Sequence, residues 1–211
     1  MDIIKKAESV RTKLKNQNDF SVNQIDMSLP IIPPFIGTDE IRLIIIGQDP
    51  TIRNSATRKK ITCTLNLDKK NVLKVYIDEI CKEFDISIEN VYATNLFKYF
   101  YTIPPADTTE VLQNHLTLNL NVLKQELAAY KNTPVIVLGE TILQLLTTNK
   151  TMIRTFWDYN KKTRASSGNF SISTATDNKL NRDFYPFPHQ PSLRKEFYKN
   201  TLKDYIKFMR K

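Results

Sequence analysis

Short runs of β-branched residues that end in glycine are the feature that most constrains how this chain folds. The run IRLIIIG ends at Gly47, and the run PVIVLG ends at Gly139. Neither run alternates apolar with polar residues, which is typical of strands covered on both faces, as in parallel sheets between helices. Segments with apolar residues at helical spacing lie before, between and after the runs. The alternation predicts a doubly wound α/β fold.

The expected elements follow from this periodicity. Predicted strands cover residues 41–47, 91–95, 134–139 and 169–176. Predicted helices cover residues 3–14, 72–84, about 107–130, 141–146 and 192–210. Asp107 and Glu110 have the spacing of a capping box at the start of the long central helix. The basic segment TIRNSATRKK, residues 51–60, is expected to be a surface loop. We therefore expect one domain over residues 1–211, a three-layer sandwich with a small, mainly parallel four-stranded sheet flanked by helices.

Composition limits the classes of partner. Lys and Arg outnumber Asp and Glu by 31 to 22, which gives a net charge of +9. Such a balance favours polyanions, although many basic proteins bind no nucleic acid. The apolar runs are too short to span a bilayer, and no signal region follows Met1. We expect a monomer in the cytoplasm (bacterial-type cytosol or nucleoid) or in the nucleus, without a membrane partner.

Cysteine usage bears on metals and cofactors. Cys63 and Cys81 are the two cysteines of the chain. They cannot supply the four thiolates of a zinc or iron–sulfur site. Phosphate-loop and dinucleotide fingerprints are absent. We therefore expect no metal and no cofactor.

Three polar features lie at or after predicted strand ends, where open α/β sheets bind ligands. The tetrapeptide GQDP, residues 47–50, forms a rigid polar turn, and Asn95 follows VYAT. His189 lies in the Pro-rich loop PFPHQPSLR. An Asn amide can read a base edge, and a His can stabilise developing negative charge. Each feature also has a structural reading: a turn at Asp49, a turn at Asn95, and a hydrogen-bonded structural imidazole at His189.

Taken jointly, IIIGQDP, VYATN and HQPSL resemble the uracil-DNA glycosylase superfamily in order and in their placement at successive strand ends. The resemblance runs from about Ile41 to Phe197. It implies that Asp49 orients the attacking water and steadies positive charge on the sugar. It also implies that His189 donates to the departing base. One group thus serves a cationic sugar and the other an anionic leaving group.

The resemblance also implies contacts to the base and to DNA. Asn95 would read the edge of a base flipped out of the stack, and the backbone around Gln48 would contact another edge. The predicted base-binding residues are Gln48, Thr51, Thr64 and Asn95. Leu193 would be the wedge that enters the vacated space, and Arg194 would hold nearby phosphates. The predicted DNA-binding residues are Arg53, Ser192, Leu193 and Arg194, and the basic stretches 53–60 and 194–195 would flank the site.

Several positions depart from the family pattern. Uracil-specific relatives carry Tyr and then His after GQDP, where this chain has Thr51 and Ile52. The smaller Thr51 could broaden the range of substrates, since excluding one methyl group is worth only about 1–3 kcal/mol. The segment ITCTLNL, residues 61–67, lacks the aromatic that stacks on the base in those relatives. Thr64 or Leu65 would occupy that place, or Phe97 or Tyr99 would substitute for it.

The leading functional hypothesis is therefore a monofunctional DNA glycosylase without an iron–sulfur cluster. It would hydrolyse the N-glycosidic bond of uracil or a related damaged or modified base. A DNA-binding module of the same fold with little catalysis is the alternative from another class. A small α/β protein acting on nucleotides or other sugar derivatives is a third reading, which leaves Leu193 and the basic excess unexplained.

Overall fold

The computed structural model describes residues 2–17, 25–105, 109–190 and 195–210. Its five-stranded sheet has the order β1-β3-β2-β4-β7. The strands of this sheet are β1 (Phe35–Ile36), β2 (Leu43–Gly47), β3 (Val91–Asn95), β4 (Val135–Leu138) and β7 (Tyr185–Phe187). A separate two-stranded hairpin consists of β5 (Tyr159–Asn160) and β6 (Ala165–Ser166). The helices are α1 (Ile3–Lys15), α2 (Ser55–Arg58), α3 (Val72–Phe84), α4 (Thr109–Leu127), α5 (Glu140–Leu146), α6 (Ile153–Phe156) and α7 (Glu196–Met209), with short 3-10 helices at Thr64–Asn66 and Ile88–Asn90.

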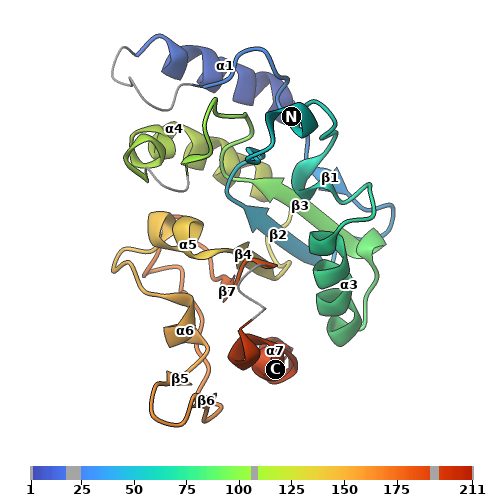
Figure 1. The fold of residues 1–211 in the computed structure, drawn as a ribbon, viewed down its shortest axis with the longest axis vertical. Helices are drawn as coiled ribbons and strands as arrows, with labels where there is room; N and C mark the ends of the chain where they lie inside the picture. Colours follow the sequence, from blue (N-terminus) through green and yellow to red (C-terminus); the bar gives the residue numbers. More distant parts are fainter. Residues whose placement is uncertain (1, 18–24, 106–108, 191–194, 211) are drawn as a thin grey trace.

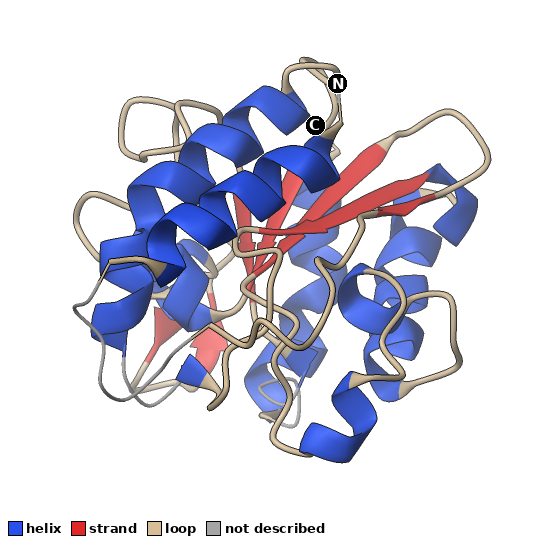
Figure 2. Ribbon diagram, turned by 90° about the horizontal axis from the view of Figure 1, so that it is seen from above, coloured by secondary structure: helices blue, strands red, loops and turns tan. Residues whose placement is uncertain are grey.

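Helices cover both faces of the sheet (Figures 1 and 2). Helix α4 packs against α1 and α5, and α3 packs against α7. Every residue of β2, β3 and β4 is buried, as the uninterrupted apolar runs predict. The doubly wound α/β class is therefore confirmed. In the described part of the chain, no helix is long and apolar enough to cross a membrane.

The sheet differs from the prediction in its number of strands and in one assignment. Strands β2, β3, β4 and β7 are parallel, and β1 adds an antiparallel edge strand on β3. The predicted strand over residues 169–176 is wrong, because this segment contributes only an isolated bridge between Ser173 and Phe184. The fourth parallel strand is β7, whose Tyr-Pro-Phe sequence resembled a loop. Pro186 is tolerated there because β7 is an edge strand.

The predicted helices are present with small differences in their bounds, whereas the short helices α2 and α6 were not predicted. The predicted cap Asp107 lies outside the described residues. The segment 51–60 is not a plain surface loop, because it contains helix α2 and buries Arg58 to 4% exposure. The Arg58 guanidinium donates to the carbonyl oxygens of Ile52, Tyr101 and Thr102 at 2.8–3.0 Å. Arg58 therefore ties two loops together and does not present its charge to a ligand, which corrects its predicted place in the basic stretch that flanks the site.

Candidate active site

The carboxyl edge of the parallel sheet brings together the three predicted polar features. Gly47 at the end of β2 pairs in register with Asn95 at the end of β3. On the other side of β2, strand β4 ends before Gly139, whose N–H donates to the carbonyl of Phe187 in β7 at 2.8 Å. His189 follows two residues later. Along this edge the order is thus Asn95, the GQDP turn, Gly139 and His189.

The absence of a side chain at Gly47 allows Asn95 its position. A Cβ atom at Gly47 would lie 2.5 Å from Asn95 Oδ1 and 2.8 Å from Leu65 Cδ2. Cβ atoms essentially never show distances under 3.0 Å, so any other residue at this position would shift the end of the Asn95 or the Leu65 side chain. The glycine at this strand end therefore serves a close approach of side chains rather than an unusual backbone angle.

The Asn95 side chain is 1% exposed, and its Oδ1 and Nδ2 atoms have no hydrogen-bond partner among the described residues. Buried amide groups are nearly always hydrogen-bonded, because leaving one unpaired costs about 1–3 kcal/mol. An amide that is held at a sheet edge with both its donor and its acceptor unused is suited to binding a planar ligand edge of complementary pattern. This is the property expected of a base-reading residue.

A buried ion pair holds the backbone beneath Asn95. The Lys98 ammonium lies 2.6 Å from Glu126 Oε2 and donates to the Asn95 carbonyl at 3.1 Å. Glu126 Oε1 accepts from the hydroxyls of Tyr92 and Thr94 at 2.6 and 2.9 Å. Burial lowers the pKa of Lys98, and the Glu126 carboxylate opposes that shift. Sequence reasoning missed this pair, although a lysine within the apolar run VYATNLFKYFY was a visible signal.

Asp49 is the carboxylate of the site and is fixed by its own turn. Its Oδ2 accepts from the Thr51 N–H at 2.9 Å, and its Oδ1 accepts from Gln48 Nε2 at 2.8 Å. Burial raises the pKa of Asp49, while the bonds from Thr51 and Gln48 and the charge of Arg58 act in the opposite direction. A partly desolvated carboxylate with a raised pKa is suited to take a proton from water.

Thr51 supports this turn from the other side. Its Oγ1 accepts from the backbone N–H of Tyr101 at 2.8 Å, which connects the GQDP turn to the loop after β3. The half-buried Thr51 side chain is thus already hydrogen-bonded within the protein. The contact of Thr51 with a base stays a prediction, which is based on the small size of this side chain.

His189 is exposed, and the loop that carries it is fixed from two elements. The Tyr76 hydroxyl of α3 donates to the Pro188 carbonyl at 3.3 Å. The indole of Trp157 donates to the Pro186 carbonyl at 2.7 Å. Gly139 passes so close that a Cβ there would lie 3.6 Å from His189 Cβ. Desolvation by the surrounding protein lowers the pKa of His189, which favours the neutral imidazole at pH 7.

Of the four residues predicted for the place of a stacking ring, Leu65 lies against the end of β2. Thr64 is buried, and its hydroxyl donates to the Pro33 carbonyl at 3.0 Å, so the side chain is directed to the protein interior. Leu65 instead lies against Gly47 and has a positive φ of 57°. Phe97 and Tyr99 are fully buried, so neither ring has surface left for a base to stack on.

The predicted DNA-binding residues are only partly described. Ser192, Leu193 and Arg194 lie outside the described residues. Arg53 is exposed on the turn between Ile52 and α2. Within the described ranges, no three His, Cys, Asp or Glu side chains cluster closely enough to hold a metal ion.

Comparison with known proteins identifies the family. A search of curated proteins finds no similar sequence. The family model described as the uracil DNA glycosylase superfamily matches residues 33–210. This range contains the whole carboxyl edge of the sheet, from the GQDP turn to the His189 loop. The chain therefore belongs to the uracil-DNA glycosylase superfamily.

Proposed function

We propose that this protein hydrolyses the N-glycosidic bond of uracil, or of a related damaged or modified base, after the nucleotide has been flipped out of DNA. Taking a base out of the stack costs a few kcal/mol. Contacts at the sheet edge would offset that cost. Asn95 and the backbone of Gln48 would bind the base edges, and Leu65 would cover one face of the base. Leu193 would enter the space left in the stack.

The proposed reaction divides charge between two groups. As the bond between C1′ and the base nitrogen breaks, the sugar becomes cationic and the base anionic. Asp49 stabilises the sugar cation and accepts a proton from the water whose oxygen bonds to C1′. Neutral His189 donates a hydrogen bond to the oxygen of the departing base, a contribution of about 3 kcal/mol for a well-placed donor. The base anion then takes a proton from solvent.

One observation carries the proposal. The buried amide of Asn95 is unpartnered among the described residues, and it meets Gly47 at the strand end that continues into Asp49. A turn residue of purely structural role would use its amide on the backbone. Family membership supports the same reading, since the matched range includes all three features.

An excision assay tests the proposal. Oligonucleotides bearing uracil, thymine, hydroxymethyluracil, hypoxanthine or a modified cytosine are incubated with the protein and then treated with alkali. Cleavage at one of these bases is expected, and Asp49→Asn and His189→Ala should each slow it sharply. Borohydride should trap no covalent complex, because water rather than a lysine amine attacks.

Two results would contradict the proposal. If both variants excise the base as well as the unchanged protein, the catalytic residues lie elsewhere. If the unchanged protein binds DNA but excises none of the five bases, the chain is better described as a DNA-binding module of the same fold.

A further inference from the structure

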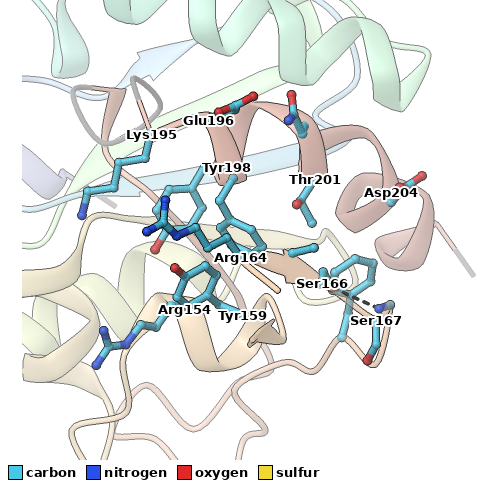
Figure 3. Close-up of a pocket in the computed structure, with 15 residues that line it drawn as sticks. Arg154, Tyr159, Arg164, Ser166, Ser167, Lys195, Glu196, Tyr198, Thr201 and Asp204 are labelled. Carbon is cyan, nitrogen blue, oxygen red and sulfur yellow. Dashed lines mark hydrogen bonds between the residues drawn. The ribbon is translucent and has the colours of Figure 1, made fainter. Parts of the chain in front are cut away.

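A large groove lies outside the candidate active site, between the β5–β6 hairpin and the start of α7. It has a volume of about 1060 Å³. Three cationic side chains line it: Arg154 of α6, Arg164 of the hairpin, and Lys195 just before α7. Figure 3 shows these three at one end of the groove, with Asp204 at the other end.

The hairpin that forms one wall is rigidly built. Oδ2 of Asp158 accepts from the N–H groups of Ser167 and Asn169 at 2.8 and 3.2 Å and from the Ser167 hydroxyl at 2.6 Å. These bonds lower the pKa of Asp158, so it is ionised and its charge is used within the hairpin. The ring of Tyr159 packs edge-on against Phe197 of α7, with centroids 4.7 Å apart. The hairpin is therefore fixed to the helix that follows the His189 loop.

The tip of this hairpin is strongly basic. Its sequence from Asn160 is NKKTR, which places Lys161, Lys162 and Arg164 within four residues. All three are exposed, and Arg164 has a positive φ of 54° that directs the tight return of the chain. None of these cations, nor Arg154 or Lys195, pairs with a carboxylate among the described residues. Three of these cations, Arg154, Arg164 and Lys195, line the groove, and Lys161 and Lys162 belong to the same hairpin tip as Arg164.

The acidic residues that line the groove, Glu196 and Asp204, form no ion pair with Arg154, Arg164 or Lys195 in the described part of the chain. Asp204 lies 3.6 Å from Lys207 on its own helix and at the far end of the groove. Glu196 occupies the first turn of α7, where a carboxylate favourably meets the helix dipole. A polyanion that enters at the basic end therefore meets positive charge first.

We propose that the basic hairpin tip and the cationic end of this groove bind the phosphate backbone of the DNA that carries the flipped base. This inference rests on the proposed function. Lys195 lines the groove and is the next residue in the sequence after Leu193 and Arg194, the predicted wedge and phosphate-binding residues. Guanidinium groups bind phosphates through paired donors, and repeated cations along a strand displace its counterions.

The test uses a charge-matched pair of variants. One replaces Lys161, Lys162 and Arg164 by Gln, and the other replaces Lys13, Lys82 and Lys131 by Gln. Lys13 lies on α1, at the opposite end of the molecule from the hairpin (Figure 1), while Lys82 and Lys131 are exposed on other elements. Fluorescence anisotropy with a labelled duplex that contains no lesion measures affinity across a range of salt concentrations. Circular dichroism and thermal unfolding establish that both variants are folded.

The hairpin variant should bind the duplex about 10- to 100-fold more weakly at low salt, and the slope of log K against log salt should fall by about 0.9 for each lost phosphate contact. The control, with the same net charge, should lose much less. Single-turnover excision at saturating protein should be unchanged in the hairpin variant, because no catalytic residue is altered.

Any one of four results would overturn the inference. The first is equal weakening in both variants, which would mean that only net charge matters. The second is an unchanged salt slope in the hairpin variant of a protein that does excise a base, which would reject the inference and leave the proposed function intact. The third is a hairpin variant that loses affinity for polyglutamate in the same assay but keeps its affinity for DNA. That result would indicate that the hairpin binds an acidic protein. A protein that neither binds nor cleaves DNA would reject the proposed function and this inference with it.

Discussion

At the scale of single residues, Gly47 decides whether Asn95 can occupy its place. We predict that Gly47→Ala lowers kcat/KM for excision by about 100-fold, the effect expected when a binding group is displaced by about 1 Å. The added Cβ would lie 2.5 Å from Asn95 Oδ1, so the amide or Leu65 must move. Single-turnover excision kinetics measure the loss.

Gly37→Ala is the control for this substitution. A Cβ at Gly37 would lie 2.1 Å from the backbone oxygen of Glu89, at the opposite edge of the sheet. This variant should lose thermal stability but keep its excision rate per folded molecule. If Gly37→Ala loses as much excision rate as Gly47→Ala does, the close approach at Gly47 has no special role in the site.

Asp49 illustrates a conflict between stability and activity at one residue. Its pKa is raised in the folded protein, so the native state binds this proton more tightly than the unfolded chain does. The stability that this preference contributes is complete below the unfolded pKa of about 3.9 and is lost as the pH rises through the raised folded pKa. Ionisation of Asp49 in the folded protein therefore lowers the stability of the fold.

We accordingly predict that Asp49→Asn lowers kcat by about 10²- to 10⁴-fold while raising the Tm at pH 7. The amide oxygen can still accept from the Thr51 N–H, and Gln48 can turn its amide to match. The gain in Tm should shrink as the pH falls from the raised folded pKa of Asp49 to the unfolded pKa of about 3.9, below which Asp49 of the unchanged protein is neutral in both states. A Tm that falls at pH 7 in this variant would show that the site does not strain the carboxylate.

The contributions of His189 and Asp49 to catalysis should be distinguishable in a profile of log kcat against pH. Desolvation by the surrounding protein lowers the pKa of His189, whereas burial raises the pKa of Asp49. The proposed mechanism assigns the ionisation that activity requires to Asp49. We predict that His189→Ala lowers kcat by about 10²- to 10³-fold but leaves the acidic limb of the profile of log kcat against pH in place. A limb that shifts in this variant would assign the titration to His189 instead of Asp49.

At the scale of elements, the buried pair of Lys98 and Glu126 joins the end of β3 to α4. Removing one partner of such a pair leaves an uncompensated buried charge, which costs about 3–5 kcal/mol. We predict this loss of unfolding free energy for Lys98→Met and for Glu126→Met, and a smaller loss for the double variant than the sum of the two. Urea denaturation measures all three. Additive losses would contradict a direct interaction.

The helices and the central strands could be predicted from sequence because their burial leaves a periodic trace. Strands β2, β3 and β4 are buried on both faces and read as uninterrupted apolar runs. Strand β7 could not be predicted in this way, because an edge strand of three residues with Pro186 has no such trace. The segment 169–176 has the alternation of a strand, but only Ser173 forms a bridge to another segment.

The GQDP turn and Asn95 lie at one edge of the sheet because the parallel strands β2 and β3 end at Gly47 and Asn95. What sequence could not provide is the contact between elements. The burial of Arg58 under two loops, the approach of Leu65 to Gly47 and the pairing of Lys98 with Glu126 depend on segments far apart in the chain. Such contacts leave no periodic pattern.

At the scale of the whole molecule, the net charge of +9 and the local contacts of the site should make separate contributions to DNA binding. Phosphate contacts release counterions and weaken with salt, whereas contacts of Asn95 with a flipped base involve no counterion. We predict that affinity for a duplex falls steeply from low to moderate salt, with the same slope for a duplex containing an excisable base and for its undamaged counterpart. Plots of log K against log salt for the two duplexes should therefore be two parallel lines with a constant offset between them.

Anisotropy with the Asp49→Asn variant, which does not consume its substrate, measures both lines. Asn95→Ala introduced into that variant should remove most of the offset without changing the slope, because it alters a base contact and no phosphate contact. The hairpin variant should reduce the salt slope and leave the offset between the two duplexes unchanged. A flat response to salt would mean that the basic surface does not contact DNA, and an offset that survives loss of the Asn95 amide would place base recognition away from this edge of the sheet.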